Sequence, residues 1–276
     1  CSFGIILMCF MILLFKQLSK PTWQVDTLDV GQGLATLIVK NGKGILYDTG
    51  SSWRGGSMAE LEILPYLKRE GIVLEKLILS HDDNDHAGGA STILKAYPNV
   101  ELITPSRKNY EENYRTFCTA GRDWHWQGLH FQILSPHNVV TRADNPHSCV
   151  ILVDDGKHRV LLTGDAEIKN EQIFARSLGK IDVLQVGHHG SKTSTSEYLL
   201  SQVRPDVAII SSGRWNPWKF PHYLVMERLH RYKSAVENTA VSGQVRVNFF
   251  QDRLEIQQAR TKFSPWYARV IGLSKE

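Results

Sequence analysis

The sequence is poor in cysteine and contains no internal repeat, and both shortages exclude classes of protein. Its four cysteines, Cys1, Cys9, Cys118 and Cys149, form no CxxC pair and follow no regular spacing. We therefore expect neither a disulfide framework nor a thiolate zinc site. The lack of repeats and low-complexity tracts argues against a solenoid or fibrous fold. With 42% hydrophobic and 22% charged residues, the composition is that of an ordinary globular protein.

Long apolar runs are also scarce, and an uncharged one lies at the N-terminus between Phe3 and Phe15. It is shorter than the roughly 20 residues that a transmembrane helix needs. Because the chain begins with Cys rather than Met, we expect residues 1–15 to be the end of a transmembrane helix that starts outside this chain. Lys16 and Lys20 would then mark the membrane boundary. A cleaved signal sequence is the alternative, but no small-residue cleavage site follows the run.

The net charge of +4 is too small to indicate nucleic-acid binding, but the charge is unevenly distributed. Residues 191–233 contain three acidic and seven basic residues, a difference that equals the whole positive excess. The basic residues are Lys192, Arg204, Arg214, Lys219, Arg228, Arg231 and Lys233. Trp215, Trp218, Phe220 and Tyr223 lie among them and offer faces on which bases could stack. A solvated basic surface over an aromatic core explains the pattern equally well.

From Trp23 onward, apolar segments rich in β-branched residues alternate with segments of helical spacing. Strands are expected within residues 23–30, 34–40, 44–51, 74–80, 159–165, 181–191, 205–213 and, as two closing strands, 244–257. Helices are expected over residues 58–69 (closed by Gly71), 167–178, 196–203 and 222–233. This alternation predicts an α/β domain. We place it at residues 21–260, between the boundary segment 1–20 and a C-terminal tail, 261–276.

Imidazole and carboxylate side chains follow four of the predicted strands. They are Asp48 after "ILY", His81, Asp83, Asp85 and His86 after "LILS", Asp165 after "LLTG", and His188 and His189 after "LQVG". In α/β sheets the active site lies just beyond the carboxyl ends of the strands. Several carboxylates at one spot would repel one another and raise each other's pKa unless a cation lay between them. Imidazole and carboxylate are ligands of Zn²⁺ and Mn²⁺, so the pattern predicts a metal site.

The spacing H-x-D-x-D-H in "SHDDNDHAGG" is similar to the H-x-H-x-D-H signature of the metallo-β-lactamase superfamily. The segments "LDVGQGLATLIV", "ILYDTG", "LLTGDAE", "VGHHGSKTS" and "NPWKFPHYLVMERL" accompany it in a characteristic order. Together they resemble the carboxyl-terminal domain of ComEC-type DNA-uptake channel proteins of bacterial natural transformation, over roughly residues 22–257. The resemblance implies an αββα four-layer sandwich, with two sheets face to face, helices outside and a metal site at one edge.

The resemblance also implies roles for individual residues. The implied ligands are His81 and Asp83 for a first ion, Asp85, His86 and one of His188 or His189 for a second, with Asp165 bridging both and Asp48 orienting the ligands. Asp85 and Asp165 are the expected catalytic residues, because two ions would activate a bridging water for attack on a phosphodiester. Asp83, where the superfamily usually has His, makes the first site harder. That change favours manganese or magnesium over zinc, and we expect Mn²⁺ to support activity at least as well as Zn²⁺.

Several positions outside the main signature bear on the site. Leu34 stands where the resembling proteins usually carry an acid, which predicts a weaker first metal site. Asn145 and Ser148 match part of an Asn-Asn-x-Ser pattern, and they are expected to support the ligands. His147 lies between them as a less favoured ligand.

The basic segment supplies the expected contacts to substrate. These contacts are Ser191, Lys192, Arg214 and Lys219; for Ser191 and Lys192 an ordinary loop explains the sequence at least as well. His222 is expected to lie near the site or to be buried for structural reasons. The remaining histidines have no ligand spacing and are expected at the surface or in the core; they are His125, His130, His137, His158 and His230. The tryptophan-rich "DWHWQG" is expected to be a strand edge.

The function implied by the resemblance is a metal-dependent DNA nuclease that degrades the strand that is not imported. Its cofactors would be two divalent ions. Its partners would be DNA, the membrane channel portion of a longer protein and other competence proteins. We expect the domain on the periplasmic side of the bacterial inner membrane. Two alternatives remain: another hydrolase of this fold acting on small phosphoesters or thioesters, or a catalytically weak domain that binds and guides DNA.

Overall fold

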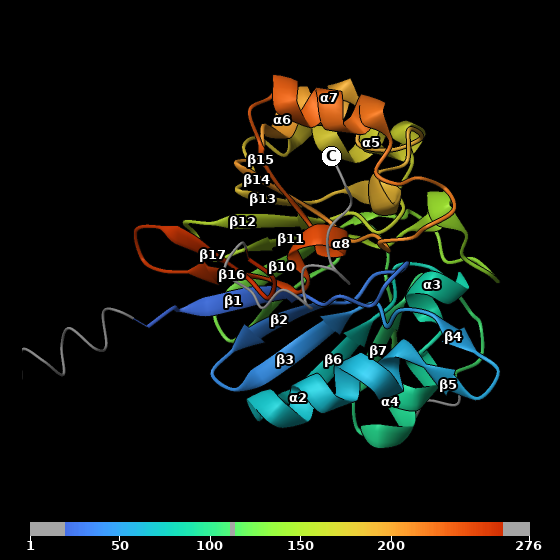
Figure 1. Ribbon diagram of the computed structural model, residues 1–276. Coiled ribbons are helices and arrows are strands. Elements are labelled where there is room, and N and C mark those ends of the chain that lie inside the picture. The colour runs from blue at the N-terminus through green and yellow to red at the C-terminus, as the bar shows by residue number, and fades with distance from the viewer. Residues whose placement is uncertain (1–19, 111–113, 262–276) are drawn as a thin grey trace, which may run out of the picture.

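A computed structural model describes residues 20–110 and 114–261. In these residues two β-sheets lie face to face, and helices cover the outer face of each sheet (Figure 1). The predicted αββα four-layer sandwich is therefore confirmed. The segment for which we predicted the end of a transmembrane helix, residues 1–15, lies outside the described residues. Among the described helices, none has the length and apolar character needed to span a bilayer.

The first sheet has eight strands and joins the two ends of the domain. From edge to edge it contains β17 (Leu254–Gln258), β16 (Val245–Phe249), β1 (Trp23–Thr27), β2 (Thr36–Lys40), β3 (Lys43–Tyr47), β6 (Val73–Ile78), β7 (Glu101–Thr104) and β8 (Arg115–Phe117). The strands from β17 to β3 pair antiparallel, and those from β3 to β8 pair parallel. β1 thus lies between its neighbour in sequence, β2, and the late strand β16.

The second sheet has seven strands. Its order is β15 (Ala235–Asn238), β14 (Val207–Ile210), β13 (Val183–Gln185), β12 (Arg159–Leu162), β11 (Val150–Asp154), β10 (Leu129–Ser135) and β9 (Asp123–Trp126). The strands from β9 to β12 are antiparallel, and those from β12 to β15 are parallel. A small separate hairpin is formed by β4 (Ser52–Trp53) and β5 (Gly56–Ser57).

The helices form the two outer layers and several short connections. On the first sheet lie the π-helical turn η1 (Ala59–Ile63), α2 (Leu64–Glu70) and α4 (Ala90–Ala96). On the second sheet lie α5 (Ile168–Phe174), η3 (Ala175–Ser177), α6 (Glu197–Val203) and α7 (Tyr223–Arg231). The short elements α3 (Asn84–Ala87), η2 (Asn145–His147), η4 (Gly187–Gly190) and α8 (Thr239–Ser242) lie in connecting loops. The four predicted helices correspond to η1 with α2, to α5 with η3, to α6 and to α7, and their bounds agree to within a few residues.

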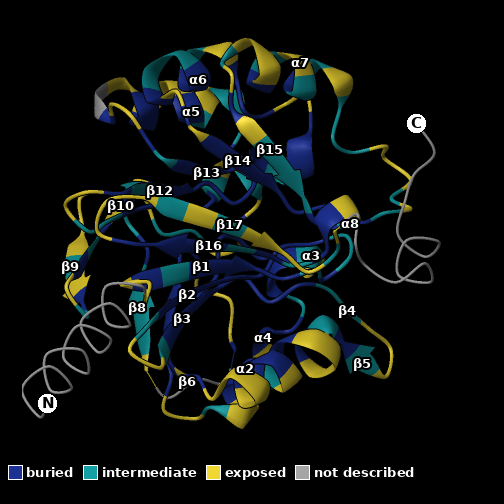
Figure 2. Ribbon diagram, turned by 60° about the vertical axis from the view of Figure 1, so that its left-hand side comes forward, coloured by how far each residue is buried: buried dark blue, intermediate teal, exposed yellow. Residues whose placement is uncertain are grey.

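The packing explains why the central strands are apolar on both faces. Successive side chains of a strand point to opposite faces of its sheet. In β2, Ile38 therefore joins the core between the two sheets. Its neighbours Leu37 and Val39 join the core beneath η1, α2 and α4. A third core lies between the second sheet and α5–α7. Figure 2 shows the result, with buried strands inside and exposed residues concentrated on the outer sides of the helices and on loops.

One disulfide crosses the interface between the sheets. Cys118 directly follows β8 of the first sheet, and Cys149 directly precedes β11 of the second. Their Cα atoms are 5.9 Å apart, and both residues are fully buried. Our expectation that the cysteines do not form disulfides is wrong for this pair. The reason is that sheet stacking, which the 31-residue sequence separation does not reveal, brings the two together.

Candidate metal centre

The predicted ligands come from the ends of strands in both sheets. Asp48 follows β3, and the His81–His86 segment follows its parallel neighbour β6. Asp165 follows β12, and His189 follows the parallel neighbour β13. Because parallel neighbours end on the same side of a sheet, these residues meet at one edge of the sandwich, between the sheets.

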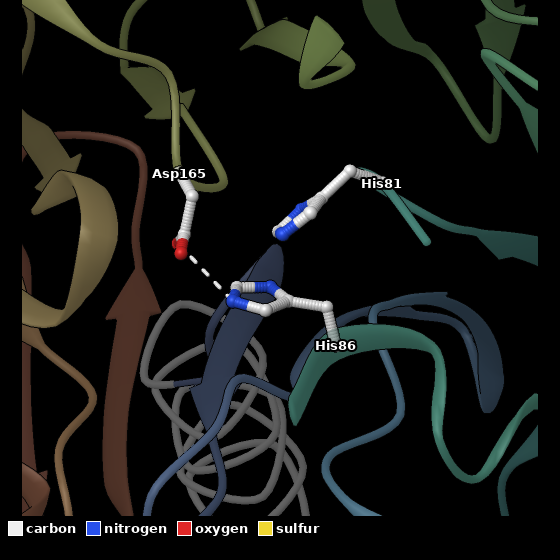
Figure 3. Close-up of side chains that lie close together, drawn as sticks. All are labelled: His81, His86 and Asp165. Carbon is white, nitrogen blue, oxygen red and sulfur yellow. Dashed lines mark ion pairs between the residues drawn. The ribbon is translucent and has the colours of Figure 1, made fainter. Parts of the chain in front are cut away.

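His81, His86 and Asp165 form the first group of ligand atoms. One ligand atom of each lies within 4.8 Å of the others, and all three residues are buried. Figure 3 shows both imidazole rings and the carboxylate converging on one space, with His86 Nε2 3.1 Å from Asp165 Oδ1. His81 Nε2 makes no hydrogen bond within the described part of the chain, although it is fully buried. Such a nitrogen is costly to bury unless something binds it.

Asp85, His86 and His189 form a second group that meets the same distance limit. His189 Nε2 lies 3.2 Å from His86 Nε2 and 3.2 Å from Asp85 Oδ2. His86 therefore belongs to both groups, whereas we expected it to serve the second ion alone. The Asp85 side chain remains 36% exposed, so the centre is open to solvent on this side.

The outer nitrogens of two histidines are fixed by groups that can only accept hydrogen bonds. His86 Nδ1 donates to Asp48 Oδ2 at 2.8 Å, and His189 Nδ1 donates to the Ser211 carbonyl oxygen at 2.8 Å. In a neutral imidazole with a protonated Nδ1, the lone pair lies on Nε2. Both Nε2 atoms point into the centre, which is the orientation that a metal ligand requires.

The charges at the centre are strongly coupled. Burial alone would lower the pKa of His86, but the carboxylates of Asp165 and Asp48 outweigh it and raise that pKa well above its ordinary value. Burial would raise the pKa of Asp165, yet His86 and His189 hold it well below its usual range. The Asp85 pKa is lowered to about 2, against the effect of burial, by His189 and His86. Asp85 and Asp165 are thus ionised at neutral pH, and the donor set fits a divalent cation.

Asp48 has the geometry expected of an orienting carboxylate. It is fully buried in a left-handed conformation (φ 62°). Its oxygens accept from Ser80 N at 2.6 Å, Ser80 Oγ at 2.7 Å and His86 Nδ1. Ser80 Oγ also lies 2.9 Å from His81 Nδ1. One carboxylate therefore fixes the orientation of the histidines on the loop after β6.

Asp83 lies at the rim rather than in either group. Its carboxylate is 3.6 Å from His81 Nε2 and forms an ion pair with Arg142 at 3.1 Å. The side chain is 37% exposed. The structure thus places this predicted ligand next to the first group, paired with a cation that the sequence patterns did not single out. Its role as a metal ligand stays a prediction.

The two adjacent histidines occupy different positions. Both have left-handed backbones, with φ 49° for His188 and 54° for His189, so strand alternation does not describe them. His189 lies within the second group, whereas His188 Nε2 is 3.7 Å from Asp165 Oδ2 and outside both groups. Asn145 Nδ2 lies 3.4 Å from His188 Nε2. Of the pair, the geometry therefore favours His189 as the ligand.

Of the other predicted residues, Ser148 contacts a ligand, whereas His147 and His222 cap helices. Ser148 Oγ accepts from Asp165 N at 3.1 Å, which ties it to the site. His147 Nδ1 accepts from Asp144 N, and His222 Nδ1 accepts from Leu224 N at the start of α7. Both are therefore helix-capping histidines. Leu34 is fully buried in the core between the sheets, and its backbone N donates to the Asp85 carbonyl oxygen at 3.0 Å.

The predicted substrate residues lie on the loop after η4 and on the loop between β14 and α7. Ser191 is buried, and its hydroxyl lies 3.0 Å from Thr193 Oγ1. Lys192 and Lys219 are exposed, and Arg214 is half-buried. These four positions remain predicted contacts.

Sequence spacing missed a further group on the β9–β10 hairpin. Asp123, His125 and His130 offer ligand atoms within 4.8 Å of one another, and the two histidine rings stack at 4.6 Å. His125 and His130 are direct cross-strand partners, a pairing that appears only when the hairpin register is known. This group is largely exposed and lies on a hairpin outside the centre at the strand ends.

The model of the metallo-beta-lactamase superfamily matches residues 28–214, a range that includes the ligands from His81 to His189. The chain belongs to this superfamily. The metallo-beta-lactamase fold protein YhfI of Bacillus subtilis has a similar structure, with a TM-score of 0.54 at 13% identity, covering 78% of this chain and 96% of that one. That likeness concerns the fold alone.

Relatives narrow the branch of the superfamily. The chain is 96% identical to Recombination protein 2 of Haemophilus influenzae over its whole length, and covers 35% of that protein. It is 33% identical to Competence protein ComA of Neisseria gonorrhoeae, covering 88% of this chain and 34% of that one. The resemblance to ComEC-type competence proteins is thus confirmed, and the chain spans about a third of the length of these relatives. It is a metal-dependent hydrolase domain of the metallo-β-lactamase type.

Proposed function

We propose that this superfamily member is a two-metal phosphodiesterase that cuts DNA as part of a DNA-uptake protein of natural transformation. The observation that carries the proposal is the pair of overlapping ligand groups that share His86 at the edge between the sheets. Two neighbouring cations are the usual catalytic device of phosphodiester hydrolysis. The name of the Neisseria gonorrhoeae relative, a competence protein, supports the biological setting.

In this proposal His81, His86 and Asp165 hold one cation, and Asp85 and His189 hold the other. When bound, the cations supply an activated water and stabilise the charge that develops on the attacking and leaving oxygens. The mixture of imidazole and carboxylate suits manganese or zinc, with magnesium as a further choice.

The chain's own residues position the reacting groups. Asp85 faces the open side, so a phosphodiester would approach past its carboxylate. Asp165, held by its backbone bond to Ser148 and buried below, would stay fixed during the reaction. Lys192 and Lys219, both exposed, would contact phosphates of the bound strand. Ser191 and Arg214 are proposed as further contacts.

We place the domain on the periplasmic side of the inner membrane, attached to the channel portion of a longer protein and working with other competence proteins. There it would degrade the strand that is not imported. The buried disulfide between Cys118 and Cys149 supports this placement, because disulfides persist in oxidising compartments such as the periplasm. The coverage of only a third of the relatives is compatible with a longer parent protein.

The test is a cleavage assay with the purified chain on labelled single- and double-stranded DNA, with Mn²⁺, Zn²⁺ or Mg²⁺ added after chelation. We expect metal-dependent cleavage that falls at least a hundred-fold in Asp85→Asn, since this change removes a charged ligand from the open side. The matched control is Asp252→Asn, at an exposed carboxylate on the turn between β16 and β17.

Two outcomes would contradict the proposal in different ways. Cleavage that survives Asp85→Asn unchanged would refute the site. DNA binding without cleavage under any metal would favour the guiding domain that Leu34 first suggested. Turnover of small esters alone, with DNA untouched, would identify a different hydrolase of this fold.

A further inference from the structure

The loop from Gly213 to His222, between β14 and α7, exposes large aromatic side chains. Trp215 is 80% exposed and Trp218 is 60% exposed, and Tyr223 at the start of α7 is 70% exposed. Three exposed aromatic side chains therefore lie within nine residues of sequence on one loop and the start of the helix after it. Where such side chains gather into a patch, they mark binding sites more often than chance exposure.

The loop is held in one conformation by its own polar groups. The Asn216 side chain donates to the Gly213 carbonyl at 2.7 Å and to the Phe220 carbonyl at 2.9 Å. Its Oδ1 accepts from Phe220 N at 2.7 Å. This side chain therefore clamps both ends of the turn that carries Trp218. A ligand that stacks on the loop would lose little free energy to ordering it.

The same loop is packed against the metal centre. His222 N donates to the Gly190 carbonyl at 2.8 Å, directly after the two histidines of η4. A Cβ on Gly190 would lie 2.6 Å from Pro221 Cβ, so only glycine permits this close approach. Trp218 stacks on Phe220, with ring centroids 6.4 Å apart and planes 16° apart. Phe220 in turn meets the His188 ring at 5.8 Å. A row of three rings thus leads from solvent to the rim of the centre.

The charge around this row selects the chemical class of the ligand. Residues 207–226 contain no Asp or Glu but contain Arg214 and Lys219, and Lys219 is exposed beside Trp218. A surface that combines cations with exposed ring faces suits a polyanion that carries aromatic groups. Nucleic acid with unpaired bases fits this description. In a duplex the base faces are already stacked on one another and cannot reach the rings.

We propose that Trp218 and Phe220 form a stacking platform that binds unpaired bases of single-stranded nucleic acid and leads the strand to the metal centre. Only the part of this inference that leads the strand to the metal centre rests on the proposed function, because strand binding itself needs no cleavage. A membrane interface also attracts tryptophan and lysine. The continuity of the ring row with His188, which points the platform toward the centre, favours nucleic acid.

The test measures binding of fluorescein-labelled oligo(dT) to the purified chain in excess chelator, so that no strand is cut. Trp218→Ala should weaken binding roughly ten-fold, the usual effect of losing one base–aromatic stack, while Trp218→Phe should retain most of it. Affinity for a blunt duplex should change less than three-fold. Trp53→Ala removes an exposed tryptophan from the β4–β5 hairpin and should leave both affinities unchanged.

Three results would overturn the platform. The first is single-strand binding by Trp218→Ala equal to that of the parent, and the second is an equal loss for single and double strands. The third is loss of binding to anionic phospholipid vesicles with single-strand binding intact, which would assign the loop to a membrane. The melting temperature of each variant should match the parent, because the side chain is mostly exposed.

A second substrate separates this failure from failure of the proposed function. Turnover of bis(p-nitrophenyl) phosphate with Mn²⁺ needs the metal centre but no strand, so Trp218→Ala should keep it. Absence of turnover on every substrate, with the Trp218→Ala binding defect present, would refute the nuclease and leave the platform standing. Metal-dependent DNA cleavage by the parent, together with normal strand binding by Trp218→Ala, would support the nuclease and refute the platform.

Discussion

At the scale of single residues, the centre depends on one carboxylate that touches no proposed substrate. Asp48 accepts three hydrogen bonds and thereby sets the loop after β6 and the orientation of His86. Its left-handed backbone is a conformation that Asn adopts readily. Asn can therefore replace it without backbone strain, while offering one acceptor oxygen in place of two.

We predict that Asp48→Asn weakens metal binding by about 10- to 100-fold, the usual effect of losing an outer hydrogen-bond partner of a metal-binding histidine. Isothermal titration with Mn²⁺ and Zn²⁺ measures the change, and circular dichroism checks the fold. Metal affinity equal to that of the parent would show that Asp48 has a structural role only. Asp29→Asn, on the loop after β1, serves as the control for a change of one charge.

The sequence selected most of the residues that the structure brings together at this centre, and what it left open has physical causes. Residue type and strand-end position were enough to select His81, Asp85, His86, Asp165 and the histidine pair. They did not reveal that Asp83 turns toward Arg142, because that cation lies 59 positions away in sequence and arrives with another loop. Nor did they distinguish His188 from His189, since both leave the strand with left-handed backbones that no spacing rule anticipates.

At the scale of elements, the loop between β1 and β2 is fitted against the loop that carries the ligands. Gly33 has a φ of 151°, and a Cβ there would lie 2.5 Å from the Asp85 carbonyl oxygen. The neighbouring Leu34 N donates to that same oxygen. The backbone of the ligand loop is thus supported from across the site, by a position where a side chain cannot fit.

We predict that Gly33→Ala lowers the free energy of unfolding by about 2–4 kcal/mol and also reduces metal affinity, because the Asp85 backbone must move. Gly42→Ala is the control, since Gly42 also has a positive φ (73°) but open space around it. It should cost about 1 kcal/mol and leave metal binding intact. Urea unfolding and metal titration of both variants make the comparison. Equal effects of the two would refute the contact with the ligand loop.

An ion pair joins α2 to β16 on the outer side of the first sheet. Arg246 Nη2 lies 2.9 Å from Glu70 Oε2, and this hydrogen bond lowers the pKa of Glu70. A lowered pKa means that the pair stabilises the fold above the pKa of an unfolded glutamate, and that the effect is lost as pH falls through the folded value.

We predict that Glu70→Gln costs about 0.5 kcal/mol at pH 7, the order expected for a partly exposed ion pair, and that it costs less at pH 3, where Glu70 loses charge. Urea midpoints at both pH values measure this. The exposed Glu60→Gln in the adjoining π-helical turn is the control. A cost that stays equal at the lower pH would show that Glu70 acts through packing rather than charge.

The elements themselves were largely predictable, and the exceptions are instructive. Most of the strands, namely β1–β3, β6, β12–β14, β16 and β17, lie at predicted strand segments, and the helices on the second sheet lie at predicted helical segments. The strands β7, β8, β10, β11 and β15 and the helix α4 were not predicted. The expectation of a strand edge at "DWHWQG" is confirmed, since β9 is the edge strand of the second sheet, whereas its partner β10 was not predicted. The stacked pair of His125 and His130 could not be predicted, because the pairing depends on the register of the hairpin, which sequence spacing does not supply.

At the scale of the whole molecule, the disulfide between Cys118 and Cys149 joins the two sheets behind the metal centre. The Cys149 carbonyl accepts from Tyr47 OH, and its N donates to the Ser80 carbonyl. The disulfide-bonded Cys149 is therefore hydrogen-bonded to Ser80, the residue whose hydroxyl contacts Asp48 and His81.

We predict that Cys118→Ser with Cys149→Ser lowers the free energy of unfolding by roughly 3–4 kcal/mol, the loss expected for a closed loop of this length. Thermal unfolding of the oxidised, reduced and doubly substituted chains measures this, and the reduced parent should behave like the double variant. A melting temperature that is unaffected by reductant would mean that the thiols are unpaired in solution.

The position of β1 has a consequence for how the domain is made. Trp23 stacks on Phe249 at 3.9 Å, and Thr22 donates to the Phe249 carbonyl across 227 positions of sequence. After β1 has been synthesised, nearly the entire domain must therefore still be made before this strand can pair with its second neighbour, β16. Contacts of such long range make folding slow, and they expose the unpaired edge of β1 in the meantime. β1 is thus among the last of the described strands to have both neighbours in place. A chain that stops before β16 would expose the unpaired edge of β1, to which strands of other chains could bind.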